Sequence, residues 1–400
     1  MPAVLPLELY DEAIDHLWDD PKALAACSLT CRAWVPTSRL HLFRTVRVQN
    51  AKHCAGFAAV LAAAPVIARY VHRLTISAEY DGFDQSGQAV EDDEWVNDVV
   101  KWVDKLECVR TVGLSRLRWG ALMPETQDTL MRLFKNVRML FLFEVRFDAS
   151  RDVLDFLSAF PVLDELYFHG VSWAHESPAP LMLSGRESLS KPQIMAKDQE
   201  RMQLSYLFLD PRSSPMLVTE WLLSHPSEQR LRTIQLCWRE IDNMKAVGDL
   251  LHASGASLEC LLVEFPDGVP EQAVLENEIS LVHNTGLRSV HFGGLNVQAS
   301  RVFLSNHLFP WVTAMLSQIR STQLQEITFE FEITTVRDLL SLDWERIDRD
   351  LSRQEFKGLL VLFYVSCEDS VATVTKEVQE LISGRLGGFR ERGTLCVSCV

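Results

Sequence analysis

The chain has 400 residues, of which 47% are apolar and 23% charged, so it is long enough for two or three domains or for one elongated repeat array. A formal charge of −15, with lysines and arginines scattered singly or in pairs, disfavours nucleic acid and anionic membranes as partners. The N-terminus does not resemble a signal peptide, no apolar run reaches the roughly 18 residues of a membrane span, and nine irregularly spaced cysteines fit reduced thiols. We therefore expect a soluble protein of the cytosol or nucleus.

The first fifty residues predict three short helices followed by a strand. Apolar side chains recur at helical spacing over 7–18, between acidic residues. A second helix is expected from Pro21 to Trp34, with Asp20 as its N-cap, and a third over 38–43. The alternating pattern at 45–48 then indicates a strand. A segment this short cannot bury a core of its own, so its apolar surface is covered either by the rest of the chain, as a helical cap, or by another protein.

The order of residues in this segment resembles an F-box. Leu5-Pro6 is followed by Leu-x-x-Cys-x-Leu-x-Cys-Arg-x-Trp over 24–34, and the match ends near Val48. The resemblance implies a module that docks onto the Skp-type adaptor of a cullin-RING ubiquitin ligase, with catalysis supplied by other subunits. The adaptor-binding residues that it implies are Leu5, Pro6, Leu9, Ile14, Leu17, Leu24, Cys27, Leu29 and Trp34.

From residue 70 onward a strand-like pattern of the form Leu-x-x-Leu-x-Leu recurs ten times, at irregular spacing. Segments of helical periodicity separate the strands, for example the apolar face of 153–160 and that of 371–382. Helix starts are expected at Ser214-Pro215 and at Asp242. The ten units are Val71-Leu74-Ile76, Val109-Val112-Leu114, Val137-Leu140-Leu142, Leu163-Leu166-Phe168, Leu204-Leu207-Leu209, Leu231-Ile234-Leu236, Leu258-Leu261-Val263, Leu287-Val290-Phe292, Leu324-Ile327-Phe329 and Phe356-Leu359-Val361.

One strand and one helix per unit resembles a leucine-rich-repeat array. The expected fold class is α/β, with a three-helix F-box at 1–48, a linker helix at 49–65 and an irregular leucine-rich-repeat-like solenoid at 66–400 that has parallel strands inside and helices outside. A doubly wound α/β domain is the alternative for the same alternation.

The chain departs from the typical repeat at one position. Leucine-rich repeats place Asn or Cys three residues after the third apolar residue, and no such ladder exists in this sequence. Residues at that position include Leu117, Val145, Val171, Arg212, Arg239, Pro266, Leu295 and Glu332.

The side chains between the apolar positions are the ones that can reach a partner, because successive strand residues point to opposite faces. On this basis Arg232, Gln235 and Glu259 are predicted to bind an unknown target protein. Two turn-rich stretches, 78–95 and 172–193, are expected to form long surface loops that either bind or are simply solvated. The rival functions are a scaffold bound to the adaptor without a ubiquitylation target, and an α/β enzyme with a helical extension.

No motif for phosphate binding, nucleophilic catalysis or zinc proteolysis occurs, and no cofactor or metal is expected. Cys396 and Cys399 form a single CxxC, but a structural zinc site needs about four ligands. We therefore interpret these cysteines as buried thiols of an end strand. Trp95, Trp102, Trp221 and Trp344 lie in helical patterns and are expected in the core.

Overall fold

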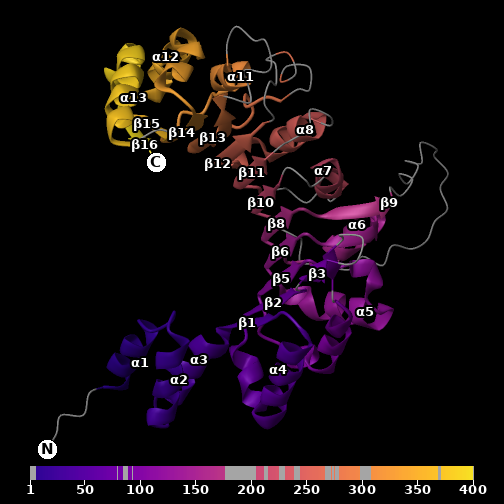
Figure 1. The fold of residues 1–400 in the computed structure, drawn as a ribbon. Coiled ribbons are helices and arrows are strands. Elements are labelled where there is room, and N and C mark those ends of the chain that lie inside the picture. Colours follow the sequence, from indigo (N-terminus) through magenta and orange to yellow (C-terminus); the bar gives the residue numbers. More distant parts are fainter. Residues whose placement is uncertain are drawn as a thin grey trace, which may run out of the picture. The chain divides into compact units, whose positions relative to one another are not determined.

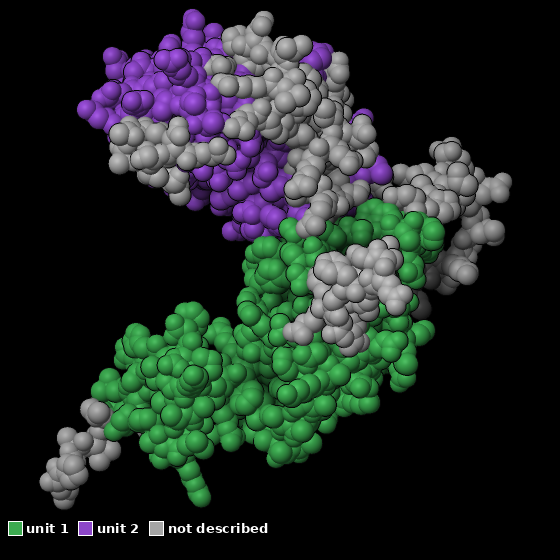
Figure 2. Space-filling view, in the orientation of Figure 1, with its two compact units in different colours: residues 1–202 green, residues 203–400 purple. Residues whose placement is uncertain are grey.

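The computed structural model describes residues 6–78, 80–83, 89–91, 93–175, 204–210, 215–224, 230–237, 244–265, 272, 274, 279–297, 308–367 and 371–399. The chain divides into two compact units, 1–202 and 203–400 (Figure 2). The sequence predicts no boundary near residue 202. The limits expected at 48 and 65 stay predictions, although a helix does occupy the range predicted for the linker.

Three helices open unit 1, with boundaries that differ from the predicted ones. The side chain of Asp20 caps α2 as expected, because its Oδ1 accepts from the N–H groups of Lys22 and Ala23 at 3.0 and 2.9 Å. The second helix is shorter than predicted because Cys31 is extended, and the third is longer because Pro36 lies in its first turn, where no N–H is needed. The helices are α1 (Leu7–Asp15), α2 (Pro21–Thr30) and α3 (Val35–Arg44).

A parallel sheet follows in unit 1, and its strands neighbour one another in sequence order. Figure 1 shows α4, α5 and α6 on one side of these strands. The sheet strands are β1 (Thr45–Val48), β2 (Arg73–Ser77), β5 (Thr111–Ser115), β6 (Met139–Phe143) and β8 (Glu165–His169). The helical segments are α4 (Ala51–Ala63), η1 (Pro65–Tyr70), η2 (Glu94–Lys101), η3 (Val103–Lys105), η4 (Trp119–Ala121), α5 (Pro124–Leu133), η5 (Phe134–Asn136) and α6 (Ser150–Ser158).

Two further strand pairs involve the segments predicted as loops. The antiparallel pair β3 (Tyr80–Phe83) and β4 (Ala89–Glu91) falls in the first stretch. In the second, β9 (Ser172–His175) pairs with β7 (Arg146–Ala149), so this stretch begins with a strand, and 176–193 lies outside the described residues.

Unit 2 repeats the plan, with parallel strands again in sequence order. In a doubly wound sheet the order of the strands reverses at one point. The strands of each unit instead follow one another in sequence order without a reversal, which excludes this alternative and confirms the expected repeat-type α/β fold class. The strands are β10 (Tyr206–Leu209), β11 (Thr233–Cys237), β12 (Cys260–Glu264), β13 (Ser289–Asn296), β14 (Glu326–Ile333), β15 (Leu360–Cys367) and β16 (Thr394–Cys399). The helical segments are α7 (Pro215–Ser224), α8 (Met244–Ser254), η6 (Gly255–Ser257), α11 (Pro310–Gln318), η7 (Val336–Ser341), α12 (Trp344–Leu351), η8 (Gln354–Phe356), α13 (Val371–Arg385) and α14 (Gly387–Arg390).

The tenth predicted motif is wrong by two residues. Pairing with β14 places Val361 and Phe363 of β15 beside Ile327 and Phe329, so the motif begins at Gly358 rather than at Phe356. Gly358 has a φ of 84°, which residues with a side chain rarely adopt. Because glycine stands where the motif normally has an apolar side chain, the sequence pattern does not show that the motif begins there. The other nine motifs coincide with β2, β5, β6, β8 and β10–β14, and their second and third apolar residues are buried.

The tryptophans and most of the described helix-face residues predicted for the core are buried, and Leu381 of α13 is half-buried. Val153, Phe156 and Phe160 of the α6 region are covered, as are Val378 and Ile382 of α13. Helix α7 begins at Pro215 as predicted, and Asp242 lies outside the described residues. The four tryptophans expected in the core, Trp95, Trp102, Trp221 and Trp344, are also buried.

A repeated backbone pattern joins neighbouring strands at their N-terminal ends. In unit 1 the carbonyl of His72 accepts from the N–H groups of Arg110 and Thr111 at 2.9 and 3.1 Å, and the carbonyl of Arg110 accepts from those of Arg138 and Met139 at 2.8 and 3.1 Å. The same two-donor pattern recurs in unit 2 at the carbonyls of Ser205, Arg232, Glu259 and Arg288. Because all these carbonyls share one motif position, the repeat is real in the backbone although its spacing in the sequence is irregular.

The position of the missing Asn ladder holds apolar side chains that pack in the core. Leu117, Val145, Val171 and Leu295 are all buried. The backbone bonding continues without an amide ladder, since the carbonyl of Leu117 accepts from Arg146 N–H at 2.8 Å. Glu332 is exposed, and Arg212, Arg239 and Pro266 lie outside the described residues. Apolar packing therefore replaces side-chain amide bonds at this position.

We predict that Val145→Asn lowers the free energy of unfolding by about 3 kcal/mol, because it removes apolar contacts and buries an amide without a partner. Val145→Ala is the matched control, and it should cost only about 2 kcal/mol because it leaves no polar group unpaired. Urea denaturation of both variants measures the difference. A Val145→Asn protein as stable as the parent would show that this position still serves an amide ladder.

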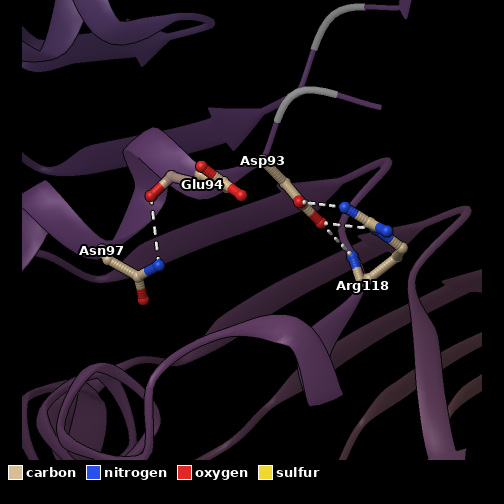
Figure 3. A network of polar contacts seen from close by, with 4 residues as sticks. All are labelled: Asp93, Glu94, Asn97 and Arg118. Carbon is tan, nitrogen blue, oxygen red and sulfur yellow. Dashed lines mark hydrogen bonds and ion pairs between the residues drawn. The ribbon is translucent and has the colours of Figure 1, made fainter. Parts of the chain in front are cut away.

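A buried carboxylate connects η2 to the turn after β5 (Figure 3). Asp93 is 1% exposed, and it accepts from the Arg118 N–H at 3.0 Å, from Nε at 3.2 Å and from Nη2 at 2.7 Å. Asn97 extends the network, because its Nδ2 donates to the Glu94 carbonyl at 3.1 Å and its Oδ1 accepts from Met123 N–H at 2.8 Å. These bonds position the segment that re-enters the core after the β3–β4 pair.

We predict that Asp93→Ala destabilises the protein by about 3 kcal/mol, because it leaves the Arg118 amide and guanidinium without their buried acceptor. Asp98→Ala provides the control, since Asp98 forms an exposed ion pair with Lys101 and should contribute less than about 0.5 kcal/mol. Equal urea midpoints for the two variants would contradict this role of Asp93.

Candidate functional site

The interior of the N-terminal module (residues 6–44) is held by apolar and polar contacts between its helices. Ile14 and Leu24 are 2% and 1% exposed, so their side chains are covered by this chain and pack the module from within. His41 Nε2 lies 2.7 Å from Asp15 Oδ1, and Thr37 Oγ1 donates to Asp11, so polar contacts join α3 to α1. The module therefore closes around these side chains, and Ile14 and Leu24 do not belong to its surface.

The outside of the module carries apolar side chains that nothing in the described chain covers. Leu29 is 87% exposed, Trp18 69% and Leu9 48%. Among the described residues, Leu29 and Trp18 are the two most exposed large apolar side chains. Each forgoes about 2 kcal/mol of burial free energy in water, which a protein partner would recover.

The remaining residues predicted to bind the adaptor differ in how far they are exposed. Pro6 is exposed, and Leu17 and Cys27 are half-buried. Trp34 is half-buried, with its ring 5.6 Å from that of Tyr10, so it is partly used inside the module. Leu5 lies outside the described residues. Sequence reasoning missed Trp18 as a surface residue, and the available signal was its position beside the Asp-Asp-Pro that ends the first helical pattern.

A second exposed feature lies on the sheet face of unit 1 that points away from the apolar core. Phe141 and Tyr167 stack with ring centroids 4.1 Å apart, and Phe143 stacks with His169 at 4.5 Å. We call Phe141, Phe143, Tyr167 and His169 the aromatic platform. All four are half-buried, and they come from β6 and β8, whose register places each pair side by side. Such a surface offers flat apolar contact area with little side-chain entropy to lose.

The residues predicted to bind a target lie on unit 2. Arg232 is exposed, whereas Gln235 and Glu259 are half-buried. Glu259 follows Arg232 in the next repeat, its N–H donating to the Arg232 carbonyl at 2.8 Å, and its carboxylate lies 3.9 Å from Arg288. Gln235 sits between Phe208 and Leu262 of the neighbouring strands. Their role in target binding stays a prediction.

The cysteines of the sheets are free thiols. Burial, together with the nearby charge of Glu264, raises the pKa of the Cys237 thiol to about 12. Cys396 is exposed and Cys399 half-buried, so the prediction that both are buried thiols is wrong. They lie on β16, which is the end strand of the sheet as the described residues form it and which has a neighbouring strand, β15, on one side. Over the described residues no group of three or more His, Cys, Asp or Glu side chains is arranged to hold a metal ion.

We predict that iodoacetamide at pH 8 alkylates Cys237 at least about tenfold more slowly than Cys396, because the raised pKa keeps the Cys237 thiol protonated and the thiolate is the nucleophile. Glu264→Gln removes the carboxylate whose charge raises the pKa of Cys237 most, so this pKa should fall and alkylation should accelerate. Peptide mass spectrometry over time gives both rates, and equal rates at Cys237 and Cys396 would contradict the protonated state.

Comparison with known proteins gives little beyond this geometry. No family model and no curated protein sequence matches the chain. A solved structure of the Rad7 and Elc1 complex in yeast aligns over 94% of this chain and 86% of that chain, at 10% identity and a TM-score of 0.37. A likeness at this level supports no conclusion about function. None of the described helices is both long and apolar enough to cross a membrane.

Proposed function

We propose that this protein is the substrate receptor of a cullin-RING ubiquitin ligase, with the N-terminal module as an F-box that docks on a Skp-type adaptor. The observation that supports the proposal best is the exposure of Trp18 and Leu29 on a module that is otherwise closed. An autonomous helical cap would turn such side chains inward, whereas a docking surface keeps them in water until a partner covers them.

The connection between the module and the sheet suits a receptor that must hold its target at a fixed place. Helix α3 ends at Arg44 and β1 begins at the next residue, without a linker. The N–H of His72, just before β2, donates to the Arg44 carbonyl at 3.0 Å. The end of α3 is therefore bound to the first two strands, and this attachment ties the module to the sheet of unit 1.

The proposal assigns no chemical step to this chain. Its contribution is geometric: one surface binds the adaptor and another binds a protein to be modified by the other subunits. The cullin reaches this complex through the adaptor. A scaffold would bind the adaptor in the same way but would not change the lifetime of the proteins that it captures.

We predict that the double variant Trp18→Ser with Leu29→Ser binds a purified Skp-type adaptor about 100-fold or more weakly, because the two most exposed apolar side chains of the proposed docking surface are lost. Met123→Ser is the matched control, since Met123 is a similarly exposed apolar side chain of unit 1 outside the module. Calorimetry measures the affinity, and circular dichroism checks that the helices persist.

Unchanged adaptor affinity in the double variant would refute the docking proposal. Where docking is lost, the same variant separates the receptor from the scaffold in cells. Proteins co-purified with the full chain should become longer-lived for a receptor, whereas their turnover should stay the same for a scaffold.

A further inference from the structure

Four arginines that lie far apart in the sequence come together on the sheet of unit 1. Arg47 of β1 pairs with Thr75 of β2, and Arg73 of β2 pairs with Thr111 of β5. Arg110 and Arg138 precede β5 and β6 at the same motif position, and the Arg138 N–H donates to the Arg110 carbonyl at 2.8 Å. We call Arg47, Arg73, Arg110 and Arg138 the arginine row.

The charges of this row are not neutralised by the described part of the chain. All four side chains are exposed. None of their guanidinium groups has a described carboxylate within ion-pair distance. The weak contacts that they make are to neutral groups: Arg73 Nη2 lies 3.8 Å from Met139 Sδ, and Arg110 Nη1 lies 3.3 Å from the Val109 carbonyl. Like charges on adjacent strands repel one another, so this arrangement costs stability within a chain of net charge −15.

The arginine row is continuous with the aromatic platform. The guanidinium carbon of Arg73 lies 5.7 Å from the ring centroid of Phe141, two strands away. The intervening strand β5 has Gly113 between Thr75 and Phe141, so no side chain separates the cation from the ring. A cation over a ring face is attracted by the ring's electrons, and the two features form one surface.

We propose that the arginine row and the aromatic platform dock an extended segment of a partner protein in which clustered carboxylates flank an aromatic or large aliphatic side chain. Arginine pairs well with carboxylates, and the platform offers the flat contact for the apolar side chain. An extended segment suits the site, because its alternate side chains point the same way about 7 Å apart, a spacing that long arginine side chains can follow. The inference rests on the proposed function in that this segment belongs to the protein to be modified.

An acidic protein segment fits the charge distribution better than a nucleic acid does. Arg116 also lies at the platform, with its guanidinium carbon 5.8 Å from the Phe143 ring centroid, but it forms an ion pair with Glu144. Asp164 and Glu165 of the β8 repeat follow the arginine row on the adjacent strand, so carboxylates bound the row on that side. A polyphosphate backbone would extend beyond the row onto a chain whose net charge repels it. Stacked bases could still use the platform, so a nucleic-acid ligand is one outcome of the test.

The test measures binding of a fluorescein-labelled peptide, in which glutamates flank one phenylalanine and one tryptophan, to the full chain by fluorescence anisotropy. We expect the double variant Arg73→Glu with Arg138→Glu to bind this peptide at least about 30-fold more weakly. The matched control is Arg69→Glu with Arg132→Glu, which makes the same change in charge at two exposed arginines of η1 and α5 and should bind within about threefold of the parent.

Two measurements on the unaltered protein keep the proposal testable if a variant misfolds. The peptide with glutamine in place of glutamate should bind at least about tenfold more weakly, and raising sodium chloride from low to high concentration should weaken binding of the acidic peptide by a similar factor. Equal binding of the two peptides, equal loss in both double variants, or tighter binding of an oligothymidylate of matched charge would each overturn the proposal.

Adaptor titration of the same variants separates this proposal from the preceding one. The arginine variants should bind the adaptor normally. If the full chain binds the acidic peptide but not the adaptor, the receptor proposal fails and the docking surface stands; the reverse result overturns the docking surface alone.

Discussion

In-register pairing of parallel strands is the constraint on which each unit depends. Neighbouring strands align residue for residue, as in the run from Arg73 beside Thr111 to Ser77 beside Ser115. Because strand side chains alternate between two faces, this alignment places every second and third apolar residue of the motif in one core and every intervening residue in one surface. The two-donor backbone bonds at the strand starts enforce the same register. Core and surface are thus two results of one alignment, and a slip of one residue would exchange them.

The N-terminal module combines a small interior with exposed apolar side chains, two features that both lower its stability. A three-helix segment has too little interior to be very stable, and this one leaves Trp18 and Leu29 in water. Contacts between α1 and α3, such as His41 with Asp15, and the direct junction of α3 with β1 supply stability that the small interior lacks. Helix α3 leads directly into the first strand, while Trp18 and Leu29 of the module remain exposed. Covalent and hydrogen-bonded attachment to the sheet is what lets the module keep apolar side chains exposed.

Sequence reasoning succeeded where a local pattern has one structural solution. The apolar motif located nine strands, Asp20 was identified as a cap, and Trp102 and Trp344 were assigned to the core. It failed where local patterns are ambiguous. The tenth motif was predicted to begin at Phe356, whereas the strand pairing places its first position at Gly358. The alternating pattern around Cys396 does not tell whether a second layer covers the strand. The helix expected to run to Trp34 ends at Thr30, because Cys31 is extended and a new helix begins at Val35 with Pro36 in its first turn.

The sequence by itself determined the secondary structure of the repeats, the absence of an Asn ladder and the three-helix start, because each depends on residues close together in the chain. It indicated no basic patch, since Arg47, Arg73, Arg110 and Arg138 are isolated from one another along the chain. Only the tertiary structure brought them into one row and stacked Phe141 on Tyr167, because lateral neighbours in a parallel sheet are separated by a whole helical crossover. Burial of Ile14 beside exposure of Leu29 was likewise decided by how the helices pack, which the spacing of apolar residues alone does not specify.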